Sequence, residues 1–303
     1  MLNLSDAVTR LKPELQSGRL IVFVGSGISV DSGLPTWDGF LDKFIEFCEQ
    51  LPSQYRGRDI ERVMGIDLLA NASTERRKKP VHVATVLKAK MGELPQNIRT
   101  NVEHDFKRWF FGLFANAQPN KKHELIASTN YPYILTSNYD LLLEEAAKQI
   151  GSPYSSLSYY QKDLIAEAIY LRNPAIIHVH GQCSDVVLNK IVLTSEDYVR
   201  VIKKGVPGFS FALQSLFLTH STLFVGYGAS DPHLEDLIEE FAYLFDFPQS
   251  DNISKNFLVL TKERAGSILD NYKRQFRTEL IVIDDYSECD FLLSELQQAS
   301  PRT

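Results

Sequence analysis

Three short segments, far apart in the chain, carry residues that are suited to chemistry. A glycine-serine loop occupies residues 25–29, and Asn138 precedes His180 by about forty residues. Each segment follows an apolar run that is typical of a buried strand. Residues at the carboxyl ends of parallel strands meet in one crevice of an open α/β sheet. The spacing therefore predicts a nucleotide site that contains an acid–base histidine.

The loop Gly25-Ser26-Gly27-Ile28-Ser29 comes directly after the apolar run 20–24 and is predicted to turn on its glycines into a helix. Backbone N–H groups at such a turn bind a pyrophosphate well. Ser26 and Ser29 add hydroxyls suited to phosphate oxygens. The same pattern also fits a tight turn without a ligand, so the loop alone is a weak signal.

The segment Thr136-Ser137-Asn138-Tyr139-Asp140 follows the next apolar run. An Asn at the end of a strand is often a turn or capping residue. Its amide is also suited to holding a ribose hydroxyl or a water molecule. Asp140 fits the N-cap of a helix that starts at Leu141 better than it fits a catalytic acid.

Two histidines, His178 and His180, stand in the third segment. Their spacing places both on one face of a strand, which suits metal binding as well as packing. Because no third ligand has metal spacing, we predict no metal site. Gly181 leaves the imidazole of His180 uncrowded, so we assign the chemical role to His180 and a structural role to His178.

The elements that must position these residues alternate between strands and helices. This pattern predicts an α/β fold with a Rossmann-like, doubly wound, mostly parallel six-stranded sheet. The strands are expected at 20–24, 133–136, 175–179, 223–225, 257–261 and 280–283. Helices are expected at 6–17 (capped by Ser5), from Trp37 to near Pro52, at 141–150 and from Ser230 onward. A helical insertion is expected at about 53–130, with helices at 81–91, 102–114 and 122–129.

The bulk composition is that of an ordinary soluble globular chain. It has 303 residues and a formal net charge of −6. The dense cationic run Arg76-Arg77-Lys78-Lys79 is interpreted as a solvated loop or helix end rather than a nucleic-acid patch. Three widely spaced cysteines make a disulfide framework or a four-cysteine zinc site unexpected. Without an apolar leader or an apolar run of about 18 residues, we expect a cytoplasmic protein that does not bind membranes.

Four motifs in order resemble the sirtuin superfamily over most of the chain. They are Gly25-Ser26-Gly27-Ile28-Ser29 with Gly33-Leu34-Pro35, Thr136-Ser137-Asn138-Tyr139-Asp140, His180-Gly181, and Gly226-Tyr227-Gly228-Ala229-Ser230-Asp231-Pro232. Two departures separate the chain from protein-deacylating sirtuins. Thr36-Trp37 replaces their Phe-Arg, and only Cys183 stands where they have a four-cysteine zinc module. Both departures resemble the bacterial sirtuin-like NAD hydrolases of antiphage defence, which share a Leu-Thr-x-x-Asp-Tyr segment, here residues 193–198, and a histidine-bearing helix, here near His123.

The resemblance implies a single sirtuin-like domain over 1–303 that hydrolyses NAD⁺ to nicotinamide and ADP-ribose, and so depletes NAD⁺ during antiphage defence. It implies catalytic roles for Asn138 and His180 and no metal. The implied NAD-binding residues are Gly25, Ser26, Gly27, Ser29, Pro35, Trp37, Thr136, Asp140, Gly226, Tyr227, Ser230 and Asp231. The alternatives are an NAD-dependent protein deacylase and a non-catalytic nucleotide-binding sensor or scaffold.

An NAD⁺ hydrolase requires restraint, and only about 20 residues follow Ile283. We therefore expect control by homo-oligomerisation or by a separately encoded partner such as a HerA-like ATPase, an Argonaute-like protein or another sensor, unless the chain is a fragment. We expect no direct nucleic-acid binding. The aromatic run Trp109-Phe110-Phe111 with Leu113-Phe114 exceeds one helix stripe and fits either a core or an interface.

Overall fold

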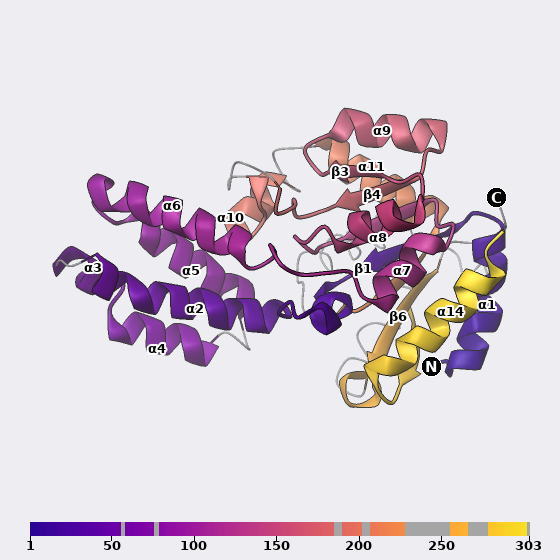
Figure 1. The fold of residues 1–303 in the computed structure, drawn as a ribbon, viewed down its shortest axis with the longest axis horizontal. Coiled ribbons are helices and arrows are strands. Elements are labelled where there is room, and N and C mark those ends of the chain that lie inside the picture. The colour runs from indigo at the N-terminus through magenta and orange to yellow at the C-terminus, as the bar shows by residue number, and fades with distance from the viewer. Residues whose placement is uncertain are drawn as a thin grey trace.

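The computed structural model describes residues 1–55, 58–75, 79–184, 190–201, 207–227, 255–265 and 278–301. A parallel sheet forms the centre of an α/β body, and a group of helices extends from one side of it as a lobe (Figure 1). The seven strands lie in the order β3-β4-β2-β1-β5-β6-β7, and all six pairings are parallel. The strands are β1 (Leu20–Val24), β2 (Tyr133–Thr136), β3 (Ser155–Ser158), β4 (Ala175–His178), β5 (Ser221–Val225), β6 (Asn256–Thr261) and β7 (Thr278–Ile283).

The six predicted strands are confirmed, and the sequence analysis missed the seventh, β3. Its sequence is Ser-Ser-Leu-Ser, with little of the apolar content that marks a strand. It forms an edge of the sheet, where Ser155 and Ser156 are exposed and Leu157 alone is a buried apolar side chain. Backbone pairing with β4, from Ser155 opposite Ala175 to Ser158 opposite His178, defines it instead.

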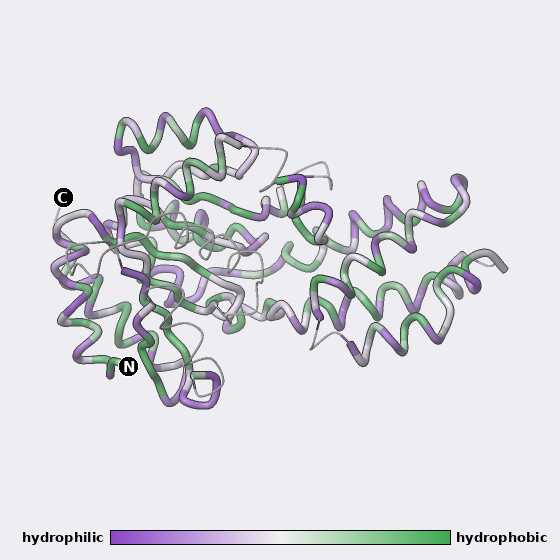
Figure 2. The backbone as a smooth tube through the Cα atoms, turned by 180° about the vertical axis from the view of Figure 1, so that it is seen from behind, coloured by the Kyte–Doolittle hydropathy of each residue, from purple (hydrophilic) through white to green (hydrophobic). Residues whose placement is uncertain are grey.

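Helices cover both faces of the sheet (Figure 1). One face is covered by α1 (Leu4–Gln16), α7 (Lys121–Ser128), α8 (Leu142–Ile150) and α14 (Cys289–Ala299), and the other by α9 (Lys162–Leu171) and α11 (Pro207–Thr219). Alternate residues of β1 point to opposite faces of the sheet. Ile21 and Phe23 pack toward α9 and α11, and Val22 packs toward α1 and α14. The central strands are therefore apolar on both sides, and Figure 2 shows hydrophobic residues along the strands at the centre of the body.

Two helix boundaries differ from the prediction. The N-cap of α1 is Asn3, whose side chain accepts a hydrogen bond from the backbone N–H of Asp6 at 2.9 Å, and Ser5 lies inside the first turn. The helix α2 (Trp37–Gln54) continues past Pro52, where an end was expected. Pro52 lies in its last turn, so only one helical hydrogen bond and very little following helix are affected.

The lobe consists of α2, α3 (Arg58–Val63), α4 (Ile66–Glu75), α5 (Pro80–Gly92) and α6 (Gln96–Gly112). These helices share an apolar cluster that is separate from the two cores of the body. It includes the fully buried Phe44 and Phe110. The later helix α7 packs on α8 and α14 and so belongs to the body. Whether the whole chain is one domain with an insertion at about 53–130 stays a prediction.

The aromatic run near the end of α6 packs into the lobe. Phe110 is fully buried, and Trp109, Phe111, Leu113 and Phe114 are partly buried against the same cluster. This is the packing alternative of the two that the sequence left open. The apolar side chains that are most exposed among the described residues lie elsewhere, at Tyr170 on α9 and Phe211 on α11.

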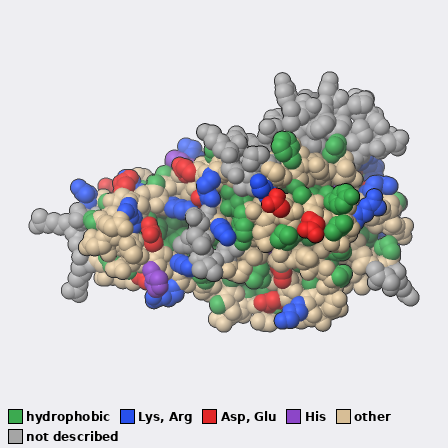
Figure 3. Space-filling view, turned by 90° about the horizontal axis from the view of Figure 1, so that it is seen from above, with side chains coloured by type: hydrophobic (Ala, Val, Ile, Leu, Met, Phe, Trp, Pro, Cys, Tyr) green, Lys and Arg blue, Asp and Glu red, His purple; other side chains and the backbone are tan. Residues whose placement is uncertain are grey.

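The surface mixes charges of both signs, as the face in Figure 3 shows. Of the cationic run, residues 76–78 lie outside the described residues, and Lys79 pairs with Glu75 at 3.7 Å on the surface. None of the helices that the structure describes is long and apolar enough to cross a membrane.

Candidate functional site

A pocket opens at the carboxyl ends of β1, β2, β4 and β5, between the body and the lobe. Strand β1 has β2 on one side and β5 on the other, so the order of the strands reverses at β1. In open α/β sheets, a crevice that can hold a ligand forms at the carboxyl ends of the strands at such a point. The empty volume is about 910 Å³, including the part open to solvent.

Ten of the predicted site residues line this pocket. They are Gly25, Ser26, Ser29, Pro35, Trp37, Asn138, Asp140, His180, Gly226 and Tyr227. Thr136 lies just beneath, where its hydroxyl donates to the carbonyl of Val24 at 2.9 Å and accepts from the backbone N–H of Asn138 at 3.0 Å. Gly27 lies behind the wall against Gly226. Ser230, Asp231 and the helix predicted to start there lie outside the described residues.

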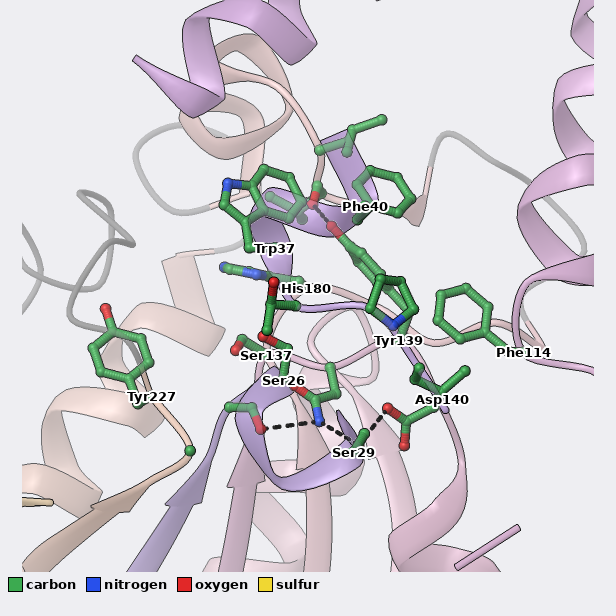
Figure 4. A pocket seen from close by; sticks show the side chains of 18 of the residues that line it. Ser26, Ser29, Trp37, Phe40, Phe114, Ser137, Tyr139, Asp140, His180 and Tyr227 are labelled. Atoms are coloured by element: carbon green, nitrogen blue, oxygen red, sulfur yellow. Dashed lines mark hydrogen bonds between the residues drawn. The ribbon is translucent and has the colours of Figure 1, made fainter. Parts of the chain in front are cut away.

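Ser29 is the centre of a buried hydrogen-bond network on the body side of the pocket (Figure 4). Its hydroxyl donates to Oδ2 of Asp140 at 3.0 Å and accepts from Nδ2 of Asn138 at 3.2 Å. Nδ2 of Asn138 also donates to the carbonyl of Gly25 at 3.3 Å. Both amide hydrogens of Asn138 are thus engaged, and the plane of its side chain is fixed.

The other amide atom of Asn138 is unused. Its Oδ1 is buried and has no hydrogen-bond partner among the residues that the structure describes. A buried carbonyl oxygen without a partner is costly and needs an explanation, such as a bound ligand or water. Asn138 lines the pocket although this oxygen itself is buried, so we infer a hydroxyl group or water molecule bound there as its partner.

His123, on α7, supports the network from behind. Its Nδ1 accepts a hydrogen bond from the backbone N–H of Asn120 at 3.2 Å, so its proton resides on Nε2, which lies 3.3 Å from Oγ of Ser29. Burial and the nearby charge of Lys122 lower the pKa of His123 to about 4. At neutral pH it is therefore a neutral donor to Ser29.

Asp140 has two roles in the network. Its Oδ1 accepts from the backbone N–H of Leu142, the first residue of α8, at 3.2 Å. The N-cap of α8 is Leu141, so the predicted N-cap role of Asp140 is wrong by one residue. Its Oδ2 accepts from Ser29. Burial raises the pKa of Asp140 above the ordinary range of a carboxyl. The site thus combines a shifted carboxyl with a shifted histidine, a combination typical of functional sites.

His180 follows β4 and lines the pocket, where Figure 4 shows its imidazole beside Trp37. Its carbonyl accepts a hydrogen bond from the backbone N–H of Val192 at 2.9 Å. The hydroxyl of Tyr139 donates to the carbonyl of Val192 at 2.7 Å. Gly181 has φ +82°, a turn that favours glycine directly after His180. The backbone at His180 is therefore well anchored.

The wall opposite the sheet is tied to the lobe through Asp197. Its Oδ2 accepts from the backbone N–H groups of Leu193 and Thr194, at 3.2 and 3.1 Å, and from Nζ of Lys88 on α5 at 2.8 Å. Lys88 lowers the pKa of Asp197 even though burial opposes this. The Leu-Thr-x-x-Asp-Tyr segment thus shapes this wall of the pocket, which Leu193 and Thr194 line.

The structure separates His178 from His180, which the sequence placed on one strand face. Strand β4 ends at His178, which is fully buried toward Glu144, whereas His180 reaches the pocket. Within the described part of the chain, no group of three His, Cys, Asp or Glu side chains is arranged to hold a metal ion.

The glycines of the first motif serve close packing of two loops. A Cβ at Gly25 would lie 2.5 Å from the carbonyl oxygen of Gly226, and one at Gly27 would lie 2.9 Å from it. Gly226 itself has φ +62°. The loop continues as a short 3₁₀ helix, η1 (Ser26–Ser32), and the next α-helix begins only at Trp37. The helix expected directly after the glycines is therefore this short 3₁₀ helix.

Sequence reasoning missed the remaining lining residues as site residues. They are Leu34, Thr36, Phe40, Val81, Phe114, Ser137, Tyr139, Val192, Leu193 and Thr194. Ser137 and Tyr139 stood inside a motif that was already singled out, so their position was a usable signal. Val81 and Phe114 come from the lobe, and no local pattern connects them with the sheet.

Comparison with known proteins places the body in a family. Residues 132–281 match the model of the SIR2-like domain. This span runs from the start of β2 into β7, and it contains Asn138 and His180. The chain carries a SIR2-like domain. The sequence-based resemblance to the sirtuin superfamily is confirmed.

Two relatives match over more of the chain than the family model does. The chain is 24% identical over 260 residues to "Defense-associated sirtuin 2" of Bacillus subtilis, which covers 86% of this chain and 22% of that protein. It is 21% identical over 309 residues to "NAD(+) hydrolase ThsA" of Enterococcus faecium, covering 96% of this chain and 58% of that protein. The chain thus spans between about a fifth and three fifths of the lengths of these two relatives.

Proposed function

We propose that this SIR2-like chain is an NAD⁺ glycohydrolase that releases nicotinamide and ADP-ribose and depletes NAD⁺ in antiphage defence. The observation that carries the proposal is the buried, unpartnered Oδ1 of Asn138 in the same pocket as His180. The names of the relatives support it, since one is called a defence-associated sirtuin and another an NAD⁺ hydrolase.

The reaction consumes one water and yields one proton. The bond between the ribose C1′ and the nicotinamide nitrogen breaks, and its electron pair leaves with nicotinamide. Positive charge develops on the ribose, and a water oxygen then bonds to C1′. Oδ1 of Asn138 accepts a hydrogen bond from the ribose hydroxyl or the attacking water. His180 accepts the proton that this water or hydroxyl loses. Such general-base help contributes about 10²–10⁴-fold.

The other predicted residues divide by position around NAD⁺. Gly25 and Ser26 are proposed to hold the pyrophosphate and its neighbouring ribose, with Gly27 allowing the loop to approach Gly226. Ser29 is proposed to act on the nucleotide site through Asn138, because its hydroxyl is already bonded to Asp140, Asn138 and His123. Pro35 and Trp37 form the edge near the lobe. Asp140 and Thr136 keep Asn138 and Ser29 in place. Gly226, Tyr227, Ser230 and Asp231 are proposed to complete the nucleotide site after β5. No metal is required.

Regulation is the remaining part of the proposal. We infer a cytoplasmic homo-oligomer whose activity depends on assembly or on a separately encoded partner, such as a HerA-like ATPase, an Argonaute-like protein or another sensor. Exposed apolar side chains on the adjacent helices α9 and α11, including Tyr170 and Phe211, are the surface that best supports an assembly interface.

The test is incubation of the purified chain with NAD⁺, alone and with candidate partners, followed by chromatography of the products. The proposal predicts equal amounts of nicotinamide and ADP-ribose without any added peptide. O-acetyl-ADP-ribose that forms only with an acetylated peptide would replace the proposal with a deacylase. NAD⁺ binding in calorimetry without turnover, in every combination, would replace it with a sensor or scaffold.

A further inference from the structure

His178 is a buried titratable group that the proposed reaction does not use. It lies at the end of β4, between Thr136 of β2 and Ser158 of β3 in the sheet register, and its side chain is fully buried. Its Nδ1 lies 3.0 Å from the backbone carbonyl oxygen of Asn138. Its Nε2 lies 2.7 Å from Oε1 of Glu144 on α8.

Both contacts require a proton on the imidazole. A carbonyl oxygen only accepts hydrogen bonds, and so does an ionised carboxylate, so Nδ1 and Nε2 must each donate. The imidazole is then the charged form, paired with the Glu144 carboxylate. Burial opposes this charge, but Glu144 outweighs it and raises the pKa of His178, while His178 lowers the pKa of Glu144. Ser156 donates a further hydrogen bond to Oε1 of Glu144 at 2.8 Å.

The acceptor that His178 engages belongs to the residue whose side chain is central to the pocket. Ser29 and Gly25 fix the side chain of Asn138, as described above, and Thr136 fixes its backbone N–H. Its backbone carbonyl is held only by His178 among the hydrogen bonds found in the described residues. A rotation of that peptide would swing Oδ1 of Asn138 away from its place in the pocket.

We propose that His178, held by Glu144, is a positioning residue that fixes the peptide of Asn138 and thereby aims Oδ1 of Asn138 at the reacting ribose. This inference rests on the proposed NAD⁺ hydrolysis and deepens it. The sequence suggested only a structural role for His178. The role assigned here acts through Asn138 and affects turnover more than substrate binding, because misplacement of about 1 Å in a reacting group costs on the order of 10²-fold in rate.

Two amide variants separate the two hydrogen bonds of His178. In His178→Asn, the amide nitrogen stands near the former Nδ1 and retains the donor to the Asn138 carbonyl. In His178→Gln, the amide nitrogen stands near the former Nε2 and retains the donor to Glu144. Both variants remove the charge and one hydrogen bond, but His178→Asn leaves the buried Glu144 carboxylate with Ser156 as its donor and should cost the fold more. His104→Gln is the control, because His104 lies on the lobe with 68% of its side chain exposed.

The expected result is a kcat for His178→Gln at least about tenfold below that of His178→Asn, with KM values within about threefold of each other. His178→Asn should unfold at the lower temperature, so a lower kcat in His178→Gln does not come from lost stability. Glu144→Gln should retain most of kcat, because its amide donates to Nε2 and leaves Nδ1–H on the Asn138 carbonyl. A kcat for His178→Gln equal to or above that of His178→Asn would overturn the inference while leaving the proposed function intact.

A second readout does not depend on turnover. In protein labelled with ¹⁵N-asparagine, the side-chain amide resonance of Asn138, assigned with Asn138→Asp, should move in His178→Gln and stay near its wild-type position in His178→Asn. If the wild-type protein does not cleave NAD⁺ with any partner, the proposed function fails and this measurement decides the inference. Equal displacement in both variants, or none in either, would overturn it.

Discussion

The two walls of the pocket are built in opposite ways. On the body side, Ser29, Asn138 and Asp140 are linked by hydrogen bonds of 3.0–3.2 Å, and each bond has a direction. On the lobe side, aromatic rings such as Trp37 and Phe40 pack with centroids 5.4 Å apart. Packing of rings buries apolar surface but does not fix the position of any polar atom. The body therefore contributes the fixed polar groups of the pocket. The lobe contributes an apolar wall, and the position of that wall depends on the lobe's own core.

The largest expected effect is on turnover and comes from the body side. We expect His180→Ala to lower kcat for NAD⁺ cleavage by about 10²–10⁴-fold, the usual contribution of a general base. Its unfolding temperature should hardly change, since the side chain lies at the pocket surface rather than in a core. Product chromatography and thermal unfolding measure the two quantities. Near wild-type activity in the folded variant would refute the assignment of the base, and His104→Ala on the exposed lobe surface serves as the control.

The lobe side should respond in stability. Phe110 is fully buried and its ring packs against Phe40, Phe106 and Tyr139. Phe110→Ala should therefore cost about 3–5 kcal/mol of unfolding free energy, as large-to-small changes in cores do. Denaturant unfolding measures this loss. Phe291→Ala on α14 is the matched control, because Phe291 is 51% exposed, lies outside the α9–α11 surface and should cost less than about 0.5 kcal/mol. Equal costs in the two variants would contradict the separate core of the lobe.

A smaller effect concerns pH and the support behind Ser29. The pKa of His123 is lowered to about 4 in the folded chain, against about 6.5 when unfolded. Between these values the unfolded chain binds the extra proton, so this histidine makes stability fall as the pH drops from about 6.5 to 4, by up to about 1.4 kcal/mol per pH unit.

The variant His123→Gln removes this titration while its amide retains a donor toward Ser29. We expect a shallower loss of unfolding free energy in that variant over the same pH range, measured by denaturant titrations at each pH. Parallel curves for the variant and the wild type would show that His123 is not neutral in the fold. The titrations of Asp140 and the His178–Glu144 pair remain in both proteins and cancel in the comparison.

The smallest expected effect is that of a metal chelator. Neither wall offers ligands with metal spacing in the sequence, so we predict that NAD⁺ cleavage proceeds at an unchanged rate after chelation and dialysis. Elemental analysis of the purified protein provides the companion measurement. Stoichiometric zinc, with activity lost on its removal and restored on its return, would contradict the prediction.

The strands of the body could be predicted from the sequence, because short local patterns mark them. Apolar runs mark the buried strands, and the residues after β1, β2, β4 and β5 converge as parallel strands require. The edge strand β3 was not predicted, because its pairing with β4 rather than its own composition defines it. The hydrogen bonds within the site were not predicted either. Ser29 and Asn138 are 109 residues apart, so a sequence pattern places both at one sheet edge without showing that they bond.

The lobe side of the pocket and the buried pair of His178 and Glu144 were harder to predict from the sequence. Val81 and Phe114 reach the pocket only because the lobe folds onto its own aromatic core, a three-dimensional outcome with no periodic signature at those positions. The role of His178 depended on Glu144, a residue that looked like any acid on the first turn of a helix. Helical periodicity does not tell which of several acids faces a buried imidazole.

The interlock of Gly25, Gly27 and Gly226 has a consequence for engineering. A Cβ at Gly25 would meet Gly226, and a Cβ at Gly226 would lie 2.6 Å from the backbone nitrogen of Ile28. The loops after β1 and β5 are therefore a matched pair, although about 200 residues of chain separate them. Grafting the first loop onto another scaffold would fail unless its counterpart travels with it. The transplantable unit is the pair, held on two adjacent parallel strands in their native register.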